Sequence, residues 1–229
     1  MSLAFEHPPA FTVPIFGEET EFPVRRIFCV GRNYEKHAAE MGGEVDREAP
    51  WYFTKTPINA ILSGATVPYP QGTSNYHHEM EMAVYLGAEA FQVDQGSAMS
   101  CVLGYSCALD MTRRDRQQDG KDHRRPWDVG KDVENGAVLA PISRDFQVAA
   151  DVRIHLEVNG APRQDATLSE LVWSVAEVIA HLSHLYRLMP GDVILTGTPA
   201  GVGPVVAGDV VTGGIDGLAP ISLTLSEPE

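Results

Sequence analysis

Cysteine, basic side chains and long apolar runs are all scarce in this chain of 229 residues. Its three cysteines, Cys29, Cys101 and Cys107, are too few for a disulfide framework, and Cys29 and Cys107 stand in apolar runs, which favours buried thiols in a reducing cytoplasm. No apolar run approaches the ~18 residues that a membrane helix needs, and residues 1–9 lack a basic start followed by an apolar segment. We therefore expect a cytoplasmic protein without a membrane span or a signal peptide.

The shortage of positive charge excludes a second group of functions. The chain has 17 Lys and Arg against 31 Asp and Glu, a formal net charge of −14. Nucleic acids and anionic membranes are bound by broad basic surfaces, and the sequence offers none, so neither is expected as a partner. Hydrophobic residues at 44% and charged residues at 21% are ordinary for a globular protein.

The hydrophobic pattern predicts a β-rich α+β fold. Short apolar runs bounded by Gly, Pro and Asn recur along the chain, and one long helical pattern follows a Thr-Leu-Ser-Glu capping box at 167–170. Strands outnumber helices and do not alternate with them, which argues against a doubly wound parallel sheet. We expect a short hairpin extension over residues 1–24 and a single domain over 25–229. Short helices are expected at 32–41 and 112–118, followed by a mobile charged loop at 119–132.

Two acidic side chains, Glu79 and Glu81, share one face of an otherwise apolar predicted strand. Strand side chains alternate between faces, so the two carboxylates point the same way, about 7 Å apart along the strand, while Met80 and Met82 point to the core. Two ionised carboxylates repel, so a cation, a basic side chain or a shared proton must accompany them; a solvated strand face is the alternative. Asp110, at the end of another predicted strand, adds a third carboxylate, unless it is the N-cap of the next helix. Oxygen ligands without a thiolate favour Mg²⁺, Mn²⁺ or Ca²⁺ over zinc.

Several other side chains have the chemistry that catalysis needs. His37 and Glu40 are three residues apart on a predicted helix, so the carboxylate can hold one imidazole nitrogen and leave the other as a base; a solvated surface pair is the alternative. Lys131 could bind a carboxylate or stabilise an enolate, and Lys55, on an aromatic strand, needs a partner if it faces the core. The Gly-rich loop after residue 195 lacks the ending of a P-loop, but it could present backbone N–H groups and the Thr198 hydroxyl to a carboxylate.

Taken together, these residues lie in motifs that resemble the fumarylacetoacetate hydrolase family. The motifs occur in the family's order and spacing over residues 25–225: Val-Gly-Arg-Asn-Tyr at 30–34 followed by His37 and Glu40, His-His-Glu-Met-Glu at 77–81, Leu-Asp-Met-Thr at 109–112 followed by Arg114, Pro-Trp at 126–127 followed by Lys131, and Leu-Thr-Gly-Thr-Pro at 195–199. Within the family, the segments at 22–26 and 46–55 are most similar to bacterial members that act on acylpyruvates.

The resemblance implies a fold, an assembly and a cofactor. The fold is the mixed β-sandwich roll of the family's C-terminal domain, usually in a homodimer. The cofactor is one Mg²⁺ or Mn²⁺ per chain, bound to Glu79, Glu81 and Asp110 and chelated by the 2-oxo acid end of a small-molecule substrate.

The resemblance also implies a reaction, the hydrolysis of the carbon–carbon bond of an acylpyruvate. His37, oriented by Glu40, would activate the water that attacks the distal carbonyl. Fumarylpyruvate would then give fumarate and a pyruvate enolate, which the metal and Lys131 would hold. The implied substrate-binding residues are Lys55, Arg114, Gln117 and Thr198.

Other functions stay open within this interpretation. The family also contains oxaloacetate decarboxylases and isomerases of the 2-hydroxyhepta-2,4-dienedioate type, which use the same metal and the same enolate. A metal-stapled structural protein without a substrate is the non-enzymatic alternative. Fumarylpyruvate, unlike acetylpyruvate, carries a second carboxylate, and its recognition in a partly dry pocket needs a cation. The candidates for this role are Arg113, Arg124 and Arg125.

Overall fold

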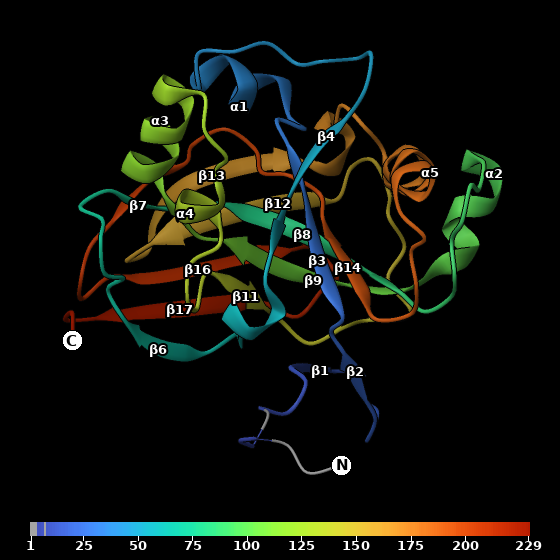
Figure 1. Cartoon of the computed structure of the whole chain (residues 1–229), viewed down its shortest axis with the longest axis horizontal. Coiled ribbons are helices and arrows are strands. Elements are labelled where there is room, and N and C mark those ends of the chain that lie inside the picture. The colour runs from blue at the N-terminus through green and yellow to red at the C-terminus, as the bar shows by residue number, and fades with distance from the viewer. Residues whose placement is uncertain (1–3, 7) are drawn as a thin grey trace.

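Two larger β-sheets dominate the computed structural model, which describes residues 4–6 and 8–229 (Figure 1). In this part of the chain, seven strands form a mixed sheet in the order β4-β3-β14-β8-β9-β11-β5, and five form a second sheet in the order β13-β12-β16-β17-β6. The strands of the first sheet are β3 (Arg26–Gly31), β4 (Trp51–Lys55), β5 (Ala60–Leu62), β8 (Met80–Leu86), β9 (Val102–Asp110), β11 (Ala137–Leu139) and β14 (Asp192–Leu195). Those of the second are β6 (Ala65–Pro68), β12 (Arg153–Val158), β13 (Ala161–Thr167), β16 (Val210–Ile215) and β17 (Ile221–Ser226). The predicted β-rich α+β fold is confirmed.

Two smaller β elements complete this architecture. The short strands β7 (Tyr76–His78), β10 (Thr112–Arg113) and β15 (Gly203–Val205) form a sheet in the order β10-β7-β15. The N-terminal hairpin pairs β1 (Thr12–Pro14) with β2 (Glu21–Pro23), as the sequence predicts. Residues 1–3 and 7 of the predicted extension lie outside the described residues, and the division at residue 24 stays a prediction.

The seven-stranded sheet is buried on both faces. Met80, Met82, Val84 and Leu86 of β8 join the cluster that fills the space toward the five-stranded sheet, as the alternation of the sequence predicts. On the opposite face, Ala83 and Tyr85 pack with side chains of the N-terminal hairpin. Glu81 shares the parity of these two residues, so it lies on their face of the strand. Glu81 therefore lies at the edge of this second apolar cluster, one position along the same face from Ala83.

The helices cover different parts of the sheets. Their bounds are α1 (Glu35–Glu40), α2 (Gln95–Ala98), α3 (Arg114–His123), α4 (Asp128–Lys131) and α5 (Val175–Leu185). In Figure 1, α1, α3 and α4 gather on one side of the molecule, whereas α2 and α5 pack together on another. Among the described residues, every helix falls short of the length and hydrophobicity that crossing a lipid bilayer requires.

The helices nearest the acids differ from those predicted. The helix expected at 32–41 is shorter, because Arg32 has a left-handed φ of 53° and α1 begins only at Glu35. The helix expected at 112–118 begins later and continues to His123, since residues 112–113 pair as β10. The expectation of a mobile loop at 119–132 is wrong. Its first part is the last turn of α3 and its last part is α4.

A third difference concerns the start of the long helix. The capping box at Thr167 is present, but it opens only a 3₁₀ turn at Leu168–Glu170. The helix α5 begins at Val175 behind a second capping box, formed by Ser174 and Glu177. Between the two boxes, Asn33 binds the chain, because its side-chain oxygen accepts a hydrogen bond of 2.7 Å from the backbone N–H of residue 173. This tertiary contact binds the segment between the two boxes, which is not helical.

Candidate active site

Strand pairing brings the three predicted acids together. Glu79 lies between β7 and β8, Glu81 lies in β8, and Asp110 ends the neighbouring antiparallel strand β9. The backbone N–H of Asp110 donates a 2.9 Å hydrogen bond to the carbonyl oxygen of Glu79, so these two residues stand opposite each other. One carboxylate oxygen from each acid lies within 4.8 Å of the others, and all three side chains are buried. The alternative of a solvated strand face is thereby excluded.

Three basic side chains from other elements neutralise two of these acids. The Lys131 ammonium, at the end of α4, lies 2.7 Å from both Glu79 Oε2 and Asp110 Oδ2. Lys55, at the end of β4, places its ammonium 2.9 Å from Asp110 Oδ1. The Arg114 guanidinium, at the start of α3, donates to Glu79 Oε1. The N-cap position of α3 is Arg113, so Asp110 is not the cap of that helix.

The two glutamates respond to burial in opposite ways. Burial alone would raise the pKa of Glu79, but the charges of Lys131 and Arg114 outweigh it and hold that pKa well below its usual range. Burial also raises the pKa of Glu81, and the neighbouring charges of Asp110 and Glu79 raise it further. The cluster therefore carries one carboxyl group whose ionised form needs additional positive charge.

The Gly-rich loop after β14 holds the carboxylate of Glu81 by a hydrogen bond. The backbone N–H of Gly197 donates a 2.7 Å hydrogen bond to Glu81 Oε2. Gly197 has a φ of 94°, and a Cβ there would lie 2.7 Å from the Cβ of Asn33, so only glycine fits. The next residue of this loop, Thr198, lies in the pocket wall, where its hydroxyl accepts a 2.8 Å hydrogen bond from Gln164. The loop thus presents a backbone N–H to a carboxylate, as the sequence predicts.

His37 and Glu40 meet on α1, as their spacing predicts. His37 Nδ1 lies 3.4 Å from Glu40 Oε2, and the same carboxylate accepts the backbone N–H of Gly201 at 3.1 Å. His37 is buried, and this burial lowers its pKa despite the opposing charge of Glu79. The imidazole is therefore neutral near pH 7, which is the form that can accept a proton.

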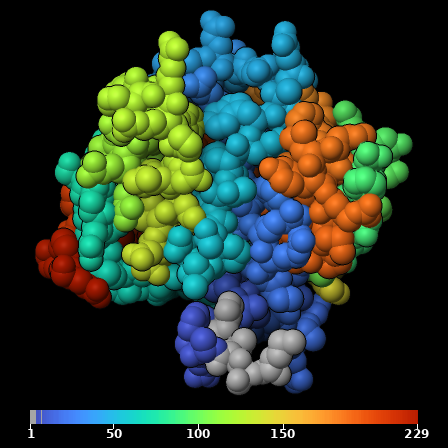
Figure 2. Space-filling view, viewed as in Figure 1, coloured from blue at the N-terminus to red at the C-terminus, as the bar shows by residue number. Residues whose placement is uncertain are grey.

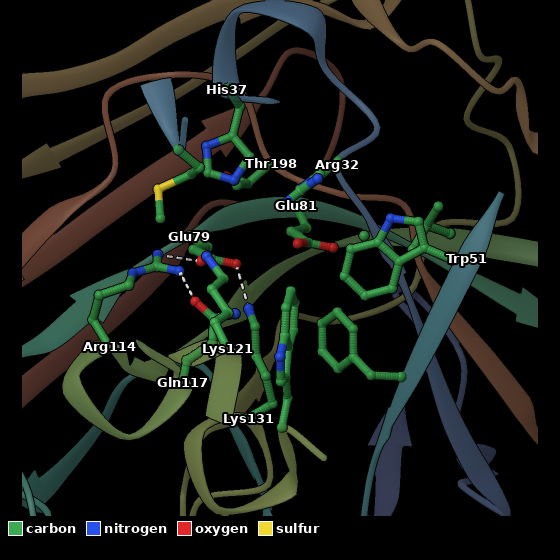
Figure 3. A pocket seen from close by; sticks show the side chains of 15 residues that line it. Arg32, His37, Trp51, Glu79, Glu81, Arg114, Gln117, Lys121, Lys131 and Thr198 are labelled. Atoms are coloured by element: carbon green, nitrogen blue, oxygen red, sulfur yellow. Dashed lines mark hydrogen bonds and ion pairs between the residues drawn. The ribbon is translucent and has the colours of Figure 1, made fainter. Parts of the chain in front are cut away.

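These side chains surround one pocket of about 400 Å³, counting its open mouth. Figure 3 shows Glu79 and Glu81 in its middle, His37 and Thr198 on one side, and Arg114, Gln117 and Lys131 on the other. Gln117 accepts a 2.7 Å hydrogen bond from Arg114. Figure 2 shows that α3 and α4 stand beside β4 on the outer face of this region. Of the predicted catalytic, substrate-binding and metal-binding residues, Lys55, Glu40 and Asp110 do not line the pocket, and each contacts another of these residues.

Cations other than the three predicted arginines line this pocket. Arg113, Arg124 and Arg125 do not line this pocket; Arg124 and Arg125 are exposed on the outside of the α3–α4 segment. Arg32 and Lys121 line it instead. The sequence carried a signal for Lys121, which is seven residues after Arg114 and therefore on the same face of a longer helix, but the predicted helix ended too early.

Three further residues of the site could not be predicted from the sequence: a buried glutamine that hydrogen-bonds the strand β8, and two tryptophans in the pocket wall. Gln164 is buried in β13, and its side-chain oxygen Oε1 accepts a 2.9 Å hydrogen bond from the backbone N–H of Met80. Trp51 and Trp127 meet edge to face at the pocket, with ring centroids 4.9 Å apart. A single Gln between charged neighbours, and two Trp residues 76 positions apart, give no sequence signal of proximity.

The donor set fits a hard divalent cation. Three carboxylates converge without a thiolate or an imidazole among them. Asp110 Oδ1 is buried and accepts no hydrogen bond among the described residues, although the Lys55 ammonium lies 2.9 Å from it. The buried Glu81, which has no basic partner among the described residues, is the second group that a cation would satisfy.

Comparisons with known proteins agree with this geometry. Residues 26–226 match the family model described as fumarylacetoacetate (FAA) hydrolase C-terminal. Fumarylpyruvate hydrolase from a Ralstonia species is 48% identical over 192 residues, covering 82% of this chain and all of that protein. The mitochondrial oxaloacetate tautomerase of Arabidopsis thaliana is 37% identical, covering 86% of this chain and 88% of the relative.

Among solved structures, the chain resembles fumarylpyruvate hydrolase from Pseudomonas aeruginosa, crystallised with Mn²⁺ and pyruvate. The TM-score is 0.93 at 38% sequence identity, and the match covers 99% of this chain and 100% of that one. The likeness therefore extends over the whole architecture, including the elements that carry the acids, the histidine and the lysines.

Proposed function

The chain belongs to the fumarylacetoacetate hydrolase family, and from that premise we propose that it hydrolyses the carbon–carbon bond of an acylpyruvate, with fumarylpyruvate as the preferred substrate. One observation carries the proposal. A buried cluster of three carboxylates lies at one pocket with a neutral histidine, and a fourth carboxylate, that of Glu40, holds this histidine by one nitrogen. That is the arrangement expected of a metal site with a general base beside it. The similarity to the Ralstonia fumarylpyruvate hydrolase supports the choice of substrate.

The proposed cofactor is one Mg²⁺ or Mn²⁺, held by Glu79, Glu81 and Asp110. When bound, such an ion supplies a Lewis acid that polarises the oxygens of a 2-oxo acid. The residues around it would orient the ligands. Gly197 fixes Glu81 through its N–H, while Lys131 and Arg114 fix Glu79.

In the proposed reaction His37 is the general base. With Nδ1 turned to Glu40, the free nitrogen Nε2 takes a proton from water as the water oxygen attacks the distal carbonyl carbon of the acylpyruvate. The bond between that carbon and the methylene group then breaks, and its electron pair passes to the pyruvate half as an enolate. The enolate takes up a proton, so that one water has been consumed and a carboxylic acid and pyruvate are released.

Lys131 is the proposed partner of the enolate. Its ammonium reaches the acid cluster from α4 and stays charged, because Asp110 and Glu79 raise its pKa against the effect of burial. A fixed positive charge where negative charge develops lowers the barrier of the cleavage step. Arg114 and Gln117 from α3 and Thr198 from the Gly-rich loop are the proposed substrate-binding groups. Lys55 from β4, the fourth residue proposed for this role, is buried against Asp110 and would act on the substrate through that carboxylate.

We further propose that the protein works as a homodimer in the cytoplasm. The three cysteines are free and buried in the structure, which suits a reducing compartment. Light scattering on the purified protein would give a mass of twice 24.9 kDa for a dimer, and a mass of 24.9 kDa would reject it.

A second candidate function is the decarboxylation or tautomerisation of oxaloacetate. It is favoured by the relatives of 37% and 38% identity named oxaloacetate tautomerase and oxaloacetate decarboxylase. Both chemistries pass through a pyruvate-type enolate, so the same basic groups would serve them. An isomerase acting on a 2-hydroxyhepta-2,4-dienedioate-type substrate would use the same groups.

A product assay distinguishes these functions. The purified protein, supplied with Mg²⁺ or Mn²⁺, is incubated separately with fumarylpyruvate, acetylpyruvate and oxaloacetate, and the products are separated. Fumarate and pyruvate in equal amounts from fumarylpyruvate are expected, at a higher kcat/KM than acetate and pyruvate from acetylpyruvate. Faster turnover of oxaloacetate, or none of either acylpyruvate, would reject the proposal.

A further inference from the structure

Two cations in the candidate active site have no acidic partner among the residues that the structure describes. Arg114 and Lys131 are each paired with Glu79, but neither Arg32 nor Lys121 forms an ion pair with any described residue. Both are half-buried, and the chain as a whole has 31 acids for 17 basic residues. Two free cations in one pocket of so acidic a protein therefore indicate that the missing anion belongs to the ligand.

Arg32 is held in the pocket by an unusual backbone. It follows directly on β3 and has a φ of 53°, a conformation that few residues with a side chain adopt. Its guanidinium lies against the loop after α1, where a Cβ on Gly43 would come 2.7 Å from Nη1. The guanidinium of Arg32 and the backbone of residue 43 are therefore close neighbours at the wall of the pocket.

Lys121 approaches the pocket from the other wall. It lies on α3 on the same face as Arg114 and Gln117, and its ammonium is 5.2 Å from the centre of the Trp127 ring. Burial lowers the pKa of Lys121, and the charges of Arg114 and Arg32 lower it further. The positive charges of Lys121 and Arg32 therefore repel each other at the pocket. A bound anion would offset this repulsion.

The separation along α3 suits a substrate with two charged ends. Seven residues of α-helix, from Arg114 to Lys121, rise about 10 Å. Fumarylpyruvate has seven carbons in a row, and with bonds of about 1.5 Å it spans roughly 8 Å from one carboxylate carbon to the other. A 2-oxo acid end near Arg114 would then place the far carboxylate near Lys121. Between the ends, Trp51 and Trp127 offer flat walls to a conjugated chain.

We propose that Arg32 and Lys121 together bind the distal carboxylate of the substrate, so that the enzyme selects acylpyruvates whose acyl group itself ends in a carboxylate. This inference rests on the proposed function for the position of the pyruvate end. It replaces Arg113, Arg124 and Arg125 in that role. Arg125, for example, points to Asp119 at 3.8 Å outside the pocket.

Kinetics on two substrates test the subsite. Lys121→Met and Arg32→Gln should each lower kcat/KM for fumarylpyruvate by about 10- to 100-fold, the range expected for losing a hydrogen bond to a charged group. The loss on acetylpyruvate, which has a methyl group at that end, should be much smaller. Lys121→Arg should keep most of the preference for fumarylpyruvate, and Arg125→Gln, which removes the same charge outside the pocket, should leave both substrates unaffected. Equal losses on both substrates, or a loss of preference in Arg125→Gln, would overturn the assignment.

A binding measurement separates the subsite from the reaction. Calorimetry on the Mn²⁺-loaded protein with pyruvate present would compare fumarate with crotonate, which has the same four-carbon trans chain but a methyl group in place of one carboxylate. The wild type should bind fumarate at least about tenfold more tightly, and Lys121→Met and Arg32→Gln should lose this difference. A difference that persists in both variants rejects the subsite. If the wild type cleaves neither acylpyruvate, the proposed function fails, and this measurement alone decides whether the two cations bind a carboxylate.

Discussion

His37 Nδ1 lies 3.4 Å from Glu40 Oε2, and the contact turns the other nitrogen of the imidazole toward the pocket. Glu40 is itself fixed by the backbone N–H of Gly201, so the orientation of the base depends on a loop that also lies beside the acids. The base, its orienting carboxylate and the acid cluster thus form one connected unit. Each part of this unit makes a separate prediction.

The pH dependence should report His37. Burial lowers the pKa of His37 and the contact with Glu40 raises it, so the neutral base is lost only as the pH falls below the ordinary histidine value of about 6.5. Glu40→Gln removes the carboxylate that raises the pKa of His37, so the acid limb of the kcat/KM profile should move to lower pH. The plateau of the profile should fall roughly 10- to 100-fold, because the imidazole is no longer oriented. An acid limb that moves to higher pH would contradict the assignment of this base.

Removal of the base should leave the metal in place. His37→Ala should lower kcat by roughly 10²–10⁴-fold, the usual contribution of a general base. The three clustered side chains that could bind a metal are Glu79, Glu81 and Asp110, and His37 is not one of them. The affinity of the variant for Mn²⁺, measured by calorimetry, should therefore hardly change. A large loss of Mn²⁺ affinity would instead place His37 among the ligands.

The acid cluster should be tested at Glu81, the member of the cluster that forms no ion pair with a described residue. Glu81→Gln keeps the size of the side chain and its acceptor for the Gly197 N–H, but it removes the charge. We expect loss of both Mn²⁺ binding and turnover, together with loss of the rise in melting temperature that Mn²⁺ gives the wild type. Full activity of this variant in EDTA would reject the metal site.

Lys131 should matter for folding when no metal is present. Its ammonium bridges Glu79 and Asp110 in a buried position, so Lys131→Met would remove one of the two basic partners that each of these buried carboxylates has. In EDTA we expect the free energy of unfolding, measured with urea, to fall by about 3–5 kcal/mol, and Mn²⁺ should restore part of it. Lys36→Met, which breaks an exposed pair with Glu170, is the matched control and should change little. An effect of similar size in both variants would argue against a structural role for the buried bridge.

Gly197 should be intolerant of any side chain. Gly197→Ala would combine a left-handed backbone with a Cβ placed 2.7 Å from Asn33, and it would displace the N–H that holds Glu81. Gly208→Ala is a close control, because Gly208 has a φ of 91° with nothing within 4 Å of its Cβ position. The first variant should lose at least about 1 kcal/mol more stability than the second, and it alone should lose metal affinity. Equal losses would show that backbone strain, and not the contact with the site, explains the glycine.

The sequence by itself determined the acids and the strand that carries them. Alternation along residues 79–86 needs only the two-residue period of a strand, so it placed Glu79 and Glu81 on one face and the methionines on the other without knowledge of the fold. The contact between His37 and Glu40 likewise follows from one helical turn. Local periodicity is sufficient wherever the interacting residues lie in the same element.

Only the tertiary structure decided what surrounds these groups. Lys55 and Lys131 reach Asp110 from 55 positions before it and 21 positions after it, and Gly197 reaches Glu81 across 116. The start of α5 moved away from a correct capping box because Asn33, far away in sequence, binds the chain at residue 173. Arg32 and Lys121 line the same pocket. Arg32 does so from a left-handed backbone position, and Lys121 from a part of α3 beyond the end of the predicted helix. Such pairings depend on how sheets and loops pack, and side chains that meet through packing leave no period in the sequence from which their contact could be predicted.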